Sequence, residues 1–104
     1  MVFENRLYTV DELSRDRVNT QDYIFMNEPC VVNAVLVLKA YSRRYGKLRM
    51  FFILEDGRKI LTPVFWFNDF CGLREIDIGT RLRLTYIDSN NGYVNLSRVE
   101  VLGE

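Results

Sequence analysis

Histidine is absent from this 104-residue sequence, and cysteine, proline and glycine are scarce. The lack of histidine removes the commonest general base, and the six scattered glycines form no phosphate-binding loop, so we expect no enzymatic activity. The two cysteines, Cys30 and Cys71, both lie among apolar residues, which favours free thiols in a reducing compartment over a disulfide. Two cysteines without a histidine also make a zinc site unfavourable, and no other cofactor is indicated.

The sequence also lacks a long apolar run. No stretch approaches the roughly 20 apolar residues of a membrane span, and residues 1–8 lack the basic and then apolar layout of a secretion signal. We therefore expect a soluble, intracellular protein with no membrane partner, located in the nucleus if the organism is eukaryotic and otherwise in the cytoplasm.

Net charge is absent as well, but the charges are unevenly distributed. Residues 39–59 contain seven basic and two acidic side chains, a local excess of +5. A neutral total argues against strong non-specific binding of nucleic acid, whereas a basic stretch confined to one region is compatible with a local phosphate-binding stripe. The same charges are equally compatible with simple solvation of exposed strand positions.

Residues 47–67 predict two strands joined by a tight turn at Asp56-Gly57, because the side chains alternate with period two. Both faces of the first of these strands are apolar. Such a strand needs a second cover besides its own core, either from another part of the chain or from a ligand.

The segments before this hairpin predict a short helix and a long strand. Thr9 and Glu12 have the spacing of a capping box at a helix start, and residues 21–26 fit either an extended segment or a single turn. Residues 30–41 are rich in β-branched side chains and predict a strand, with a bend or bulge near Asn33-Ala34 because the run is long.

The segments after the hairpin predict a short helix and two further strands. Pro63 indicates that the strand over residues 59–67 is an edge or carries a bulge. Asn91-Gly92 is a strong hairpin signal. The remaining predicted elements are a helix over residues 69–75, a strand over residues 80–88, and a strand over residues 93–102 with a shift of phase before Val99.

Five strands with a helix between the third and fourth follow the order of the OB-fold, a partly open Greek-key barrel. The segments Phe52–Gly57, Val64–Trp66, Ile78–Thr80 and Leu96–Val101 resemble OB-folds of the replication protein A type and of the related telomere-capping complexes. The resemblance implies an all-β, five-stranded OB-fold domain over residues 29–104, preceded by an N-terminal helical extension over residues 1–28. The neutral charge and the lack of a basic or Gly-rich tail depart from the free-standing members of that family.

The resemblance also implies a binding surface. In OB-folds, single-stranded nucleic acid lies across strands two and three, between the loops that follow strands one and four, and its bases stack on aromatic rings. Phe51 is equally compatible with cover by the N-terminal helix, and Phe65 with a core or partner contact. The residues that this mode would use here are Tyr41, Arg43, Arg44, Tyr45, Lys47, Arg49, Phe51, Lys59, Phe65 and Tyr93.

We therefore expect a single-stranded DNA-binding protein, with RNA as an alternative ligand, that works with a protein partner as a small subunit of a replication, repair or telomere complex. The alternative is an OB-fold protein–protein interaction module, in which the same surface packs on another subunit without touching nucleic acid. The fold alone does not decide, because OB-folds serve both functions.

Overall fold

The computed structural model describes residues 5–16, 18–42, 44, 46–65, 75–89 and 92–102, without the side chains of residues 64 and 65. Within these residues the chain forms a six-stranded, mostly antiparallel sheet and one short helix, so the expected all-β class is confirmed. The elements are β1 (Leu7–Thr9), α1 (Val10–Arg15), β2 (Cys30–Ser42), β3 (Lys47–Leu54), β4 (Lys59–Phe65), β5 (Arg81–Asp88) and β6 (Val94–Val101).

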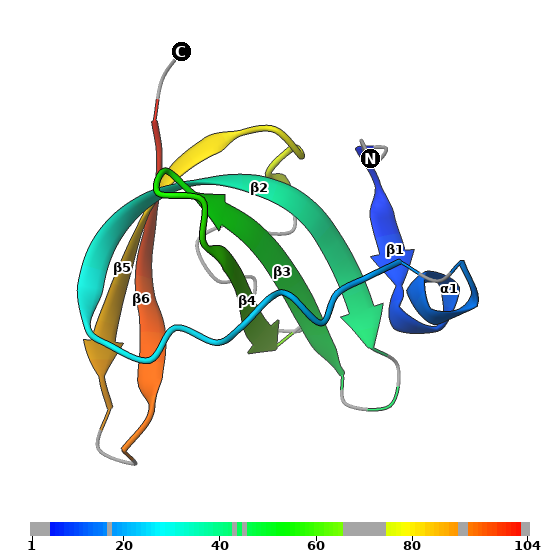
Figure 1. Cartoon of the computed structure of the whole chain (residues 1–104), viewed down its shortest axis with the longest axis horizontal. Helices are drawn as coiled ribbons and strands as arrows, with labels where there is room; N and C mark the ends of the chain where they lie inside the picture. The colour runs from blue at the N-terminus through cyan, green and yellow to red at the C-terminus, as the bar shows by residue number, and fades with distance from the viewer. Residues whose placement is uncertain are drawn as a thin grey trace.

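The strand order is β4-β3-β2-β5-β6, and β1 pairs in parallel with β2. The central strand β2 has 13 residues and arches over the molecule (Figure 1). Its first half pairs with β5 and its second half pairs with β3. Strand β1, which the sequence did not predict, lies beside residues 39–41, where β5 has already left β2.

The long strand β2 contains the expected irregularity, but not at Asn33-Ala34. The register shifts between Leu36 and Leu38, whereas Ala34 sits in regular pairs with both neighbouring strands. A bulge of one residue moves the following side chains to the other face of a sheet. Ala34 and Leu36 therefore face the main core, and Leu38 faces the opposite side.

The shift gives the sheet two hydrophobic cores. The main core is built around fully buried side chains of β2, β3 and β5, including Leu36, Phe52 and Leu84. A second, smaller core lies on the outer face of β2 and β3, where α1 and its flanking residues cover them. It consists of Tyr8, Leu13, Leu38, Ala40 and Phe51.

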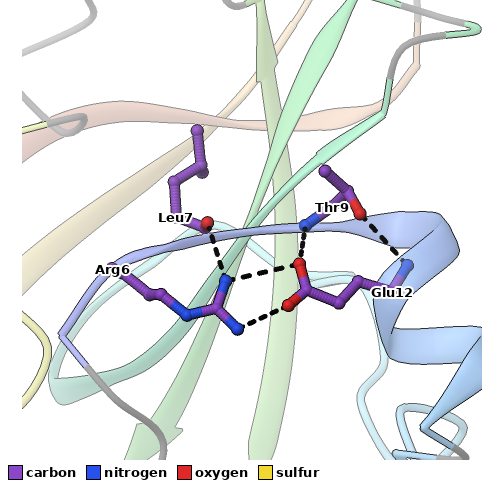
Figure 2. A network of polar contacts seen from close by, with 4 residues as sticks. All are labelled: Arg6, Leu7, Thr9 and Glu12. Carbon is purple, nitrogen blue, oxygen red and sulfur yellow. Dashed lines mark hydrogen bonds and ion pairs between the residues drawn. The ribbon is translucent and has the colours of Figure 1, made fainter.

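The helix α1 begins at the predicted capping box, as Figure 2 shows. The Glu12 N–H donates to the Thr9 hydroxyl at 3.1 Å, and the Thr9 N–H donates to the Glu12 carboxylate at 3.3 Å. Arg6 forms an ion pair with the same carboxylate. The hydrogen bond from Arg6, followed by that from the Thr9 backbone, lowers the pKa of Glu12. This network fixes the short helix at the point where the chain turns onto the outer face.

Residues 18–29, here called the strap, lead from α1 to β2 and cross the face of β3 and β4 (Figure 1). The strap contains a turn at Gln21 and Asp22 and then runs extended, so both conformations considered for this region occur. The Ile24 N–H donates to the Lys59 carbonyl at 3.1 Å, and the Ile24 carbonyl accepts from the Leu61 N–H at 2.9 Å. The strap therefore pairs with the edge of β4 that does not face β3.

The remaining turns agree with the sequence where the structure describes them. Gly57 has the positive φ of 91° that the predicted tight turn requires. The pairing of β5 with β6 shifts register at Ser97, which confirms the shift of phase predicted before Val99. The helix predicted over residues 69–75 falls outside the described residues, apart from Glu75. Among the described residues, no helix is long and apolar enough to span a membrane.

Candidate functional site

The outer face of β3 is divided into a covered part and an open part. Lys47, Arg49, Phe51 and Ile53 alternate with core residues and share this face. Phe51 is only 1% exposed and belongs to the second core. The ring of Tyr23, from the strap, meets the Phe51 ring edge to face at a centroid distance of 5.1 Å.

The expectation that Phe51 faces a ligand is therefore wrong, and its alternative, cover by the N-terminal part of the chain, is confirmed. The physical reason is that α1 and the strap supply the second cover that a strand apolar on both faces requires. A ring without accessible faces offers no surface on which a base could stack.

Three hollows with shared lining residues meet at the open part of this face and form a groove that continues past β4 toward the main-core side of the sheet. A first hollow of 340 Å³ lies where β3 begins and β4 ends. A second hollow of 440 Å³ adjoins it and reaches past the strap to β6. A third hollow of 450 Å³ continues the first toward the junction of β1 and α1. Each lies in the usual size range of ligand sites, about 300–1,000 Å³. The first hollow is lined by Phe25, Ser42, Lys47, Arg49, Leu61 and Pro63.

The three hollows are joined by shared residues. Ser42 and Arg49 line both the first and the third hollow. Phe25 of the strap, Lys47 of β3, and Leu61 and Pro63 of β4 line both the first and the second. We call the whole surface the groove. It crosses β2, β3 and β4 and ends at β6.

The groove carries mainly positive charge. Lys47 and Arg49 line its centre, and Arg44, which is exposed in the loop between β2 and β3, lines the third hollow. Asp11 is the only acidic side chain among its described lining residues. The local excess of basic residues seen in the sequence is thus partly collected on one surface.

Two exposed aromatic rings flank the second hollow. Tyr93 is 70% exposed, as its predicted role requires, and Phe25 is 62% exposed. Phe25 is not among the residues predicted from the sequence, because its position depends on the pairing of Ile24 with β4. The only local signal was the apolar triplet Ile24-Phe25-Met26 in a polar neighbourhood.

Tyr41 lies in β2, as the strand predicted over residues 30–41 implies, and not in the loop that follows Ser42. Tyr41 pairs with the buried Leu48, so it points to the face opposite Lys47 and Arg49. It is half-buried and reaches the groove only at the end of the sheet, in the third hollow.

Lys59, another predicted site residue, is not among the residues that line the groove. Lys59 is exposed at the far end of β4, where its ammonium lies 3.9 Å from the Asp22 carboxylate and 5.7 Å from the centre of the Tyr23 ring. These contacts hold it against the strap. Phe65 ends β4, but its side chain is outside the description, as are Arg43 and Tyr45.

Beneath the second hollow lies a buried polar pair. The Thr62 hydroxyl and the Tyr86 hydroxyl are 2.8 Å apart and hydrogen-bonded, and they connect β4 with β5. Burial raises the pKa of Tyr86 to about 12. Within the described ranges, no three His, Cys, Asp or Glu side chains gather as a metal site would require. The chemistry that the groove does offer is cationic groups, ring faces and apolar walls.

Comparisons with models of protein families, with curated proteins and with solved structures gave no match.

Proposed function

We propose that this protein binds single-stranded DNA along the groove, as an OB-fold subunit of a complex that maintains DNA. The observation that carries the proposal is the continuity of the groove, which brings Arg44, Lys47 and Arg49 together with the exposed rings of Phe25 and Tyr93. A flexible single strand needs such a combination, because its phosphates pair with cations and its bases stack on rings.

The strand order supports the OB-fold part of the proposal. Taken from β2, the order β5-β2-β3-β4 is the 4-1-2-3 order of a Greek key. Counted in the same way, β3 and β4 are strands two and three, and the groove runs over them from the first connecting loop toward the β5–β6 hairpin. This is the region with which OB-folds bind oligonucleotides.

The small size of the site favours binding of DNA together with a partner protein. Stacking contributes about 1–3 kcal/mol per base, and two exposed rings would therefore supply a modest affinity. Three phosphate contacts would give a slope of log K against log salt concentration of about −2, since each contact on a single strand contributes about −0.7. A neutral chain with such a site fits a subunit whose partner adds further contacts.

The test is a fluorescence-anisotropy titration with labelled single- and double-stranded oligonucleotides at two salt concentrations. We expect the protein to bind the single strand better than the double strand. The double variant Lys47→Ala/Arg49→Ala should bind the single strand about tenfold more weakly, and its slope of log K against log salt concentration should be shallower by about 1.4. The matched control is Arg83→Ala/Arg98→Ala, which removes the same charge from exposed positions of β5 and β6 outside the groove. Equal binding by both double variants would contradict the proposal.

The same titration addresses the alternative, a protein–protein module. Under that alternative, the wild-type protein fails to bind oligonucleotides at low salt. The apolar walls of the groove, Phe25, Leu61 and Pro63, would then be contact residues for another subunit.

A further inference from the structure

We infer that Phe25 is a ring on which a DNA base stacks, and that docking of the strap on β4 and binding of DNA stabilise each other. The inference rests on the proposed function and deepens it. It makes the strap, which lies before the predicted barrel in the sequence, a part of the binding site.

Phe25 is exposed although the residues on both sides of it are fixed. Ile24 is held to β4 by both of its backbone groups, at 3.1 Å and 2.9 Å. Met26 is 6% exposed and belongs to the main core. Phe25, which lies between them, is 62% exposed and faces the groove. Its exposure is therefore a property of an anchored backbone rather than of a loose loop.

The anchoring continues on the N-terminal side of Phe25. Tyr23 packs edge to face on Phe51 at 5.1 Å, and Lys59 lies over the Tyr23 ring at 5.7 Å. A ring held in place before the ligand arrives binds more tightly than one that must first be ordered, because less conformational entropy is lost. Phe25 is thus suited to stacking in a way that a flexible aromatic residue is not.

Phe25 also lies where a base would need it. It lines the first hollow with Lys47 and Arg49, and the second hollow with Lys47 and Tyr93. A strand that places phosphates near Lys47 and Arg49 can therefore direct bases to rings on either side of the second hollow. Phe25 is an exposed ring that lines both parts of this path.

Coupling between strap and ligand follows from this geometry. If DNA contacts Phe25 only when Ile24 is paired with β4, the pairing raises the affinity for DNA. Bound DNA then raises the equilibrium constant of the pairing by the same factor. The hydrogen bonds to follow are those of the Ile24 and Leu61 amides. Both should exchange more slowly with solvent deuterium when an oligonucleotide is bound.

The test uses the full chain and a labelled oligothymidine. Phe25→Ala should weaken binding about tenfold, which corresponds to the loss of one stacked base, and Phe25→Tyr should restore most of it. The control Ile87→Ala truncates another exposed apolar side chain, 48% exposed on β5, and should bind as the wild type does. Thermal unfolding checks that Phe25→Ala keeps its stability, as expected for an exposed residue.

A second variant tests the strap itself. Ile24→Pro removes the N–H that donates to Lys59, so it should weaken binding by releasing the strap from β4, although the Phe25 side chain itself is unchanged. Amide exchange of Leu61, measured by NMR with and without oligothymidine, gives a readout that does not depend on any variant folding correctly. Slower exchange with ligand supports the coupling.

The outcomes separate the two proposals. If wild-type protein binds but Phe25→Ala binds equally well, or Leu61 exchange is unchanged by the ligand, the present inference is overturned and the proposed function stands. If wild-type protein does not bind single strands at low salt, the proposed function falls, and this inference with it.

Discussion

At the scale of single residues, the hydrogen bond between Thr62 and Tyr86 is a buried side-chain contact that joins β4 to β5. Tyr86 is 3% exposed and Thr62 is 7% exposed, and their hydroxyl groups are 2.8 Å apart. A buried hydroxyl without a partner costs about 1–3 kcal/mol, whereas a satisfied one is nearly neutral. The pair therefore satisfies both hydroxyl groups at the junction of β4 and β5, and ionisation of Tyr86 would place a charge in this buried position.

The raised pKa of Tyr86 predicts a loss of stability in alkali. Burial raises this pKa from 10.0 to about 12, so above pH 10 the unfolded chain releases the proton before the folded one does. The contribution is complete below about pH 10 and is lost as the pH rises through about 12, amounting to about 3 kcal/mol. We expect urea unfolding measured across this range to show the decline, and Tyr86→Phe to reduce it.

Two other groups bear on the control for this prediction. Burial raises the pKa of Tyr23 as well, so a smaller decline should persist in Tyr86→Phe. Burial lowers the pKa of Lys39, so the folded chain holds this proton less firmly than the unfolded chain does. The contribution of Lys39 to stability therefore increases as the pH rises toward 10.5, the ordinary pKa of the group. An alkaline decline in Tyr86→Phe as steep as in the wild type would show that Tyr86 is not its source.

At the scale of elements, the helix α1 has only six residues, too few for stability by itself. Its start is fixed by the capping box of Thr9 and Glu12, and its apolar side by the burial of Leu13. We predict that Thr9→Ala lowers the free energy of unfolding by about 1 kcal/mol, measured by urea denaturation. Ser14→Ala, at an exposed position within the helix, is the matched control and should change it little.

The same cap has a defined pH dependence. The hydrogen bond from Arg6 holds the pKa of Glu12 below 4.5, so the contribution of this carboxylate is present above about pH 4.5 and is lost as the pH falls further. The stability of the wild type should therefore fall more in acid than that of Glu12→Gln, which keeps an oxygen acceptor for the Thr9 N–H but carries no charge. An equal fall in both proteins would argue that the charge of Glu12 takes no part in the cap.

The elements that the sequence predicted well are those determined by neighbouring residues. The capping box at Thr9, the turn at Gly57 and the shift of phase before Val99 each depend on a few adjacent positions. Strand β1 was not predicted, because its three residues gain their partners only from β2, some thirty positions away. The bulge was misplaced because β2 is apolar on both faces around Leu36, and its pattern therefore does not mark where the faces exchange.

In the candidate site, too, the features determined by neighbouring residues could be predicted and those determined by distant contacts could not. The cations Arg44, Lys47 and Arg49 could be predicted because strand alternation and loop position decide their exposure. Phe51 was wrongly expected to be exposed, since an apolar outer face does not distinguish cover by a ligand from cover by the chain itself. Phe25 was missed because its place depends on a contact between the strap and β4.

At the scale of the whole molecule, the N-terminal residues and the sheet depend on each other. Tyr8 and Leu13 belong to the second core, and Met26 belongs to the main core. Fully burying one such side chain contributes about 1.5–3 kcal/mol, and small domains have a total stability of about 5–15 kcal/mol. The three side chains together thus contribute a large part of what holds the fold.

A chain that starts at Pro29 should therefore be strongly destabilised. It would lose these three side chains and uncover Leu38 and Phe51, each 1% exposed in the full chain. We expect a large fall in melting temperature by circular dichroism, together with binding of a dye specific for exposed apolar surface.

Two substitutions in the full chain calibrate this effect. Leu13→Ala removes one buried side chain and should cost about 2–5 kcal/mol, an intermediate loss, while Leu7→Ala truncates a residue that is 36% exposed and should cost much less. A shortened chain that melts like the wild type and binds no dye would show that the outer face of β3 needs no cover from the N-terminal residues.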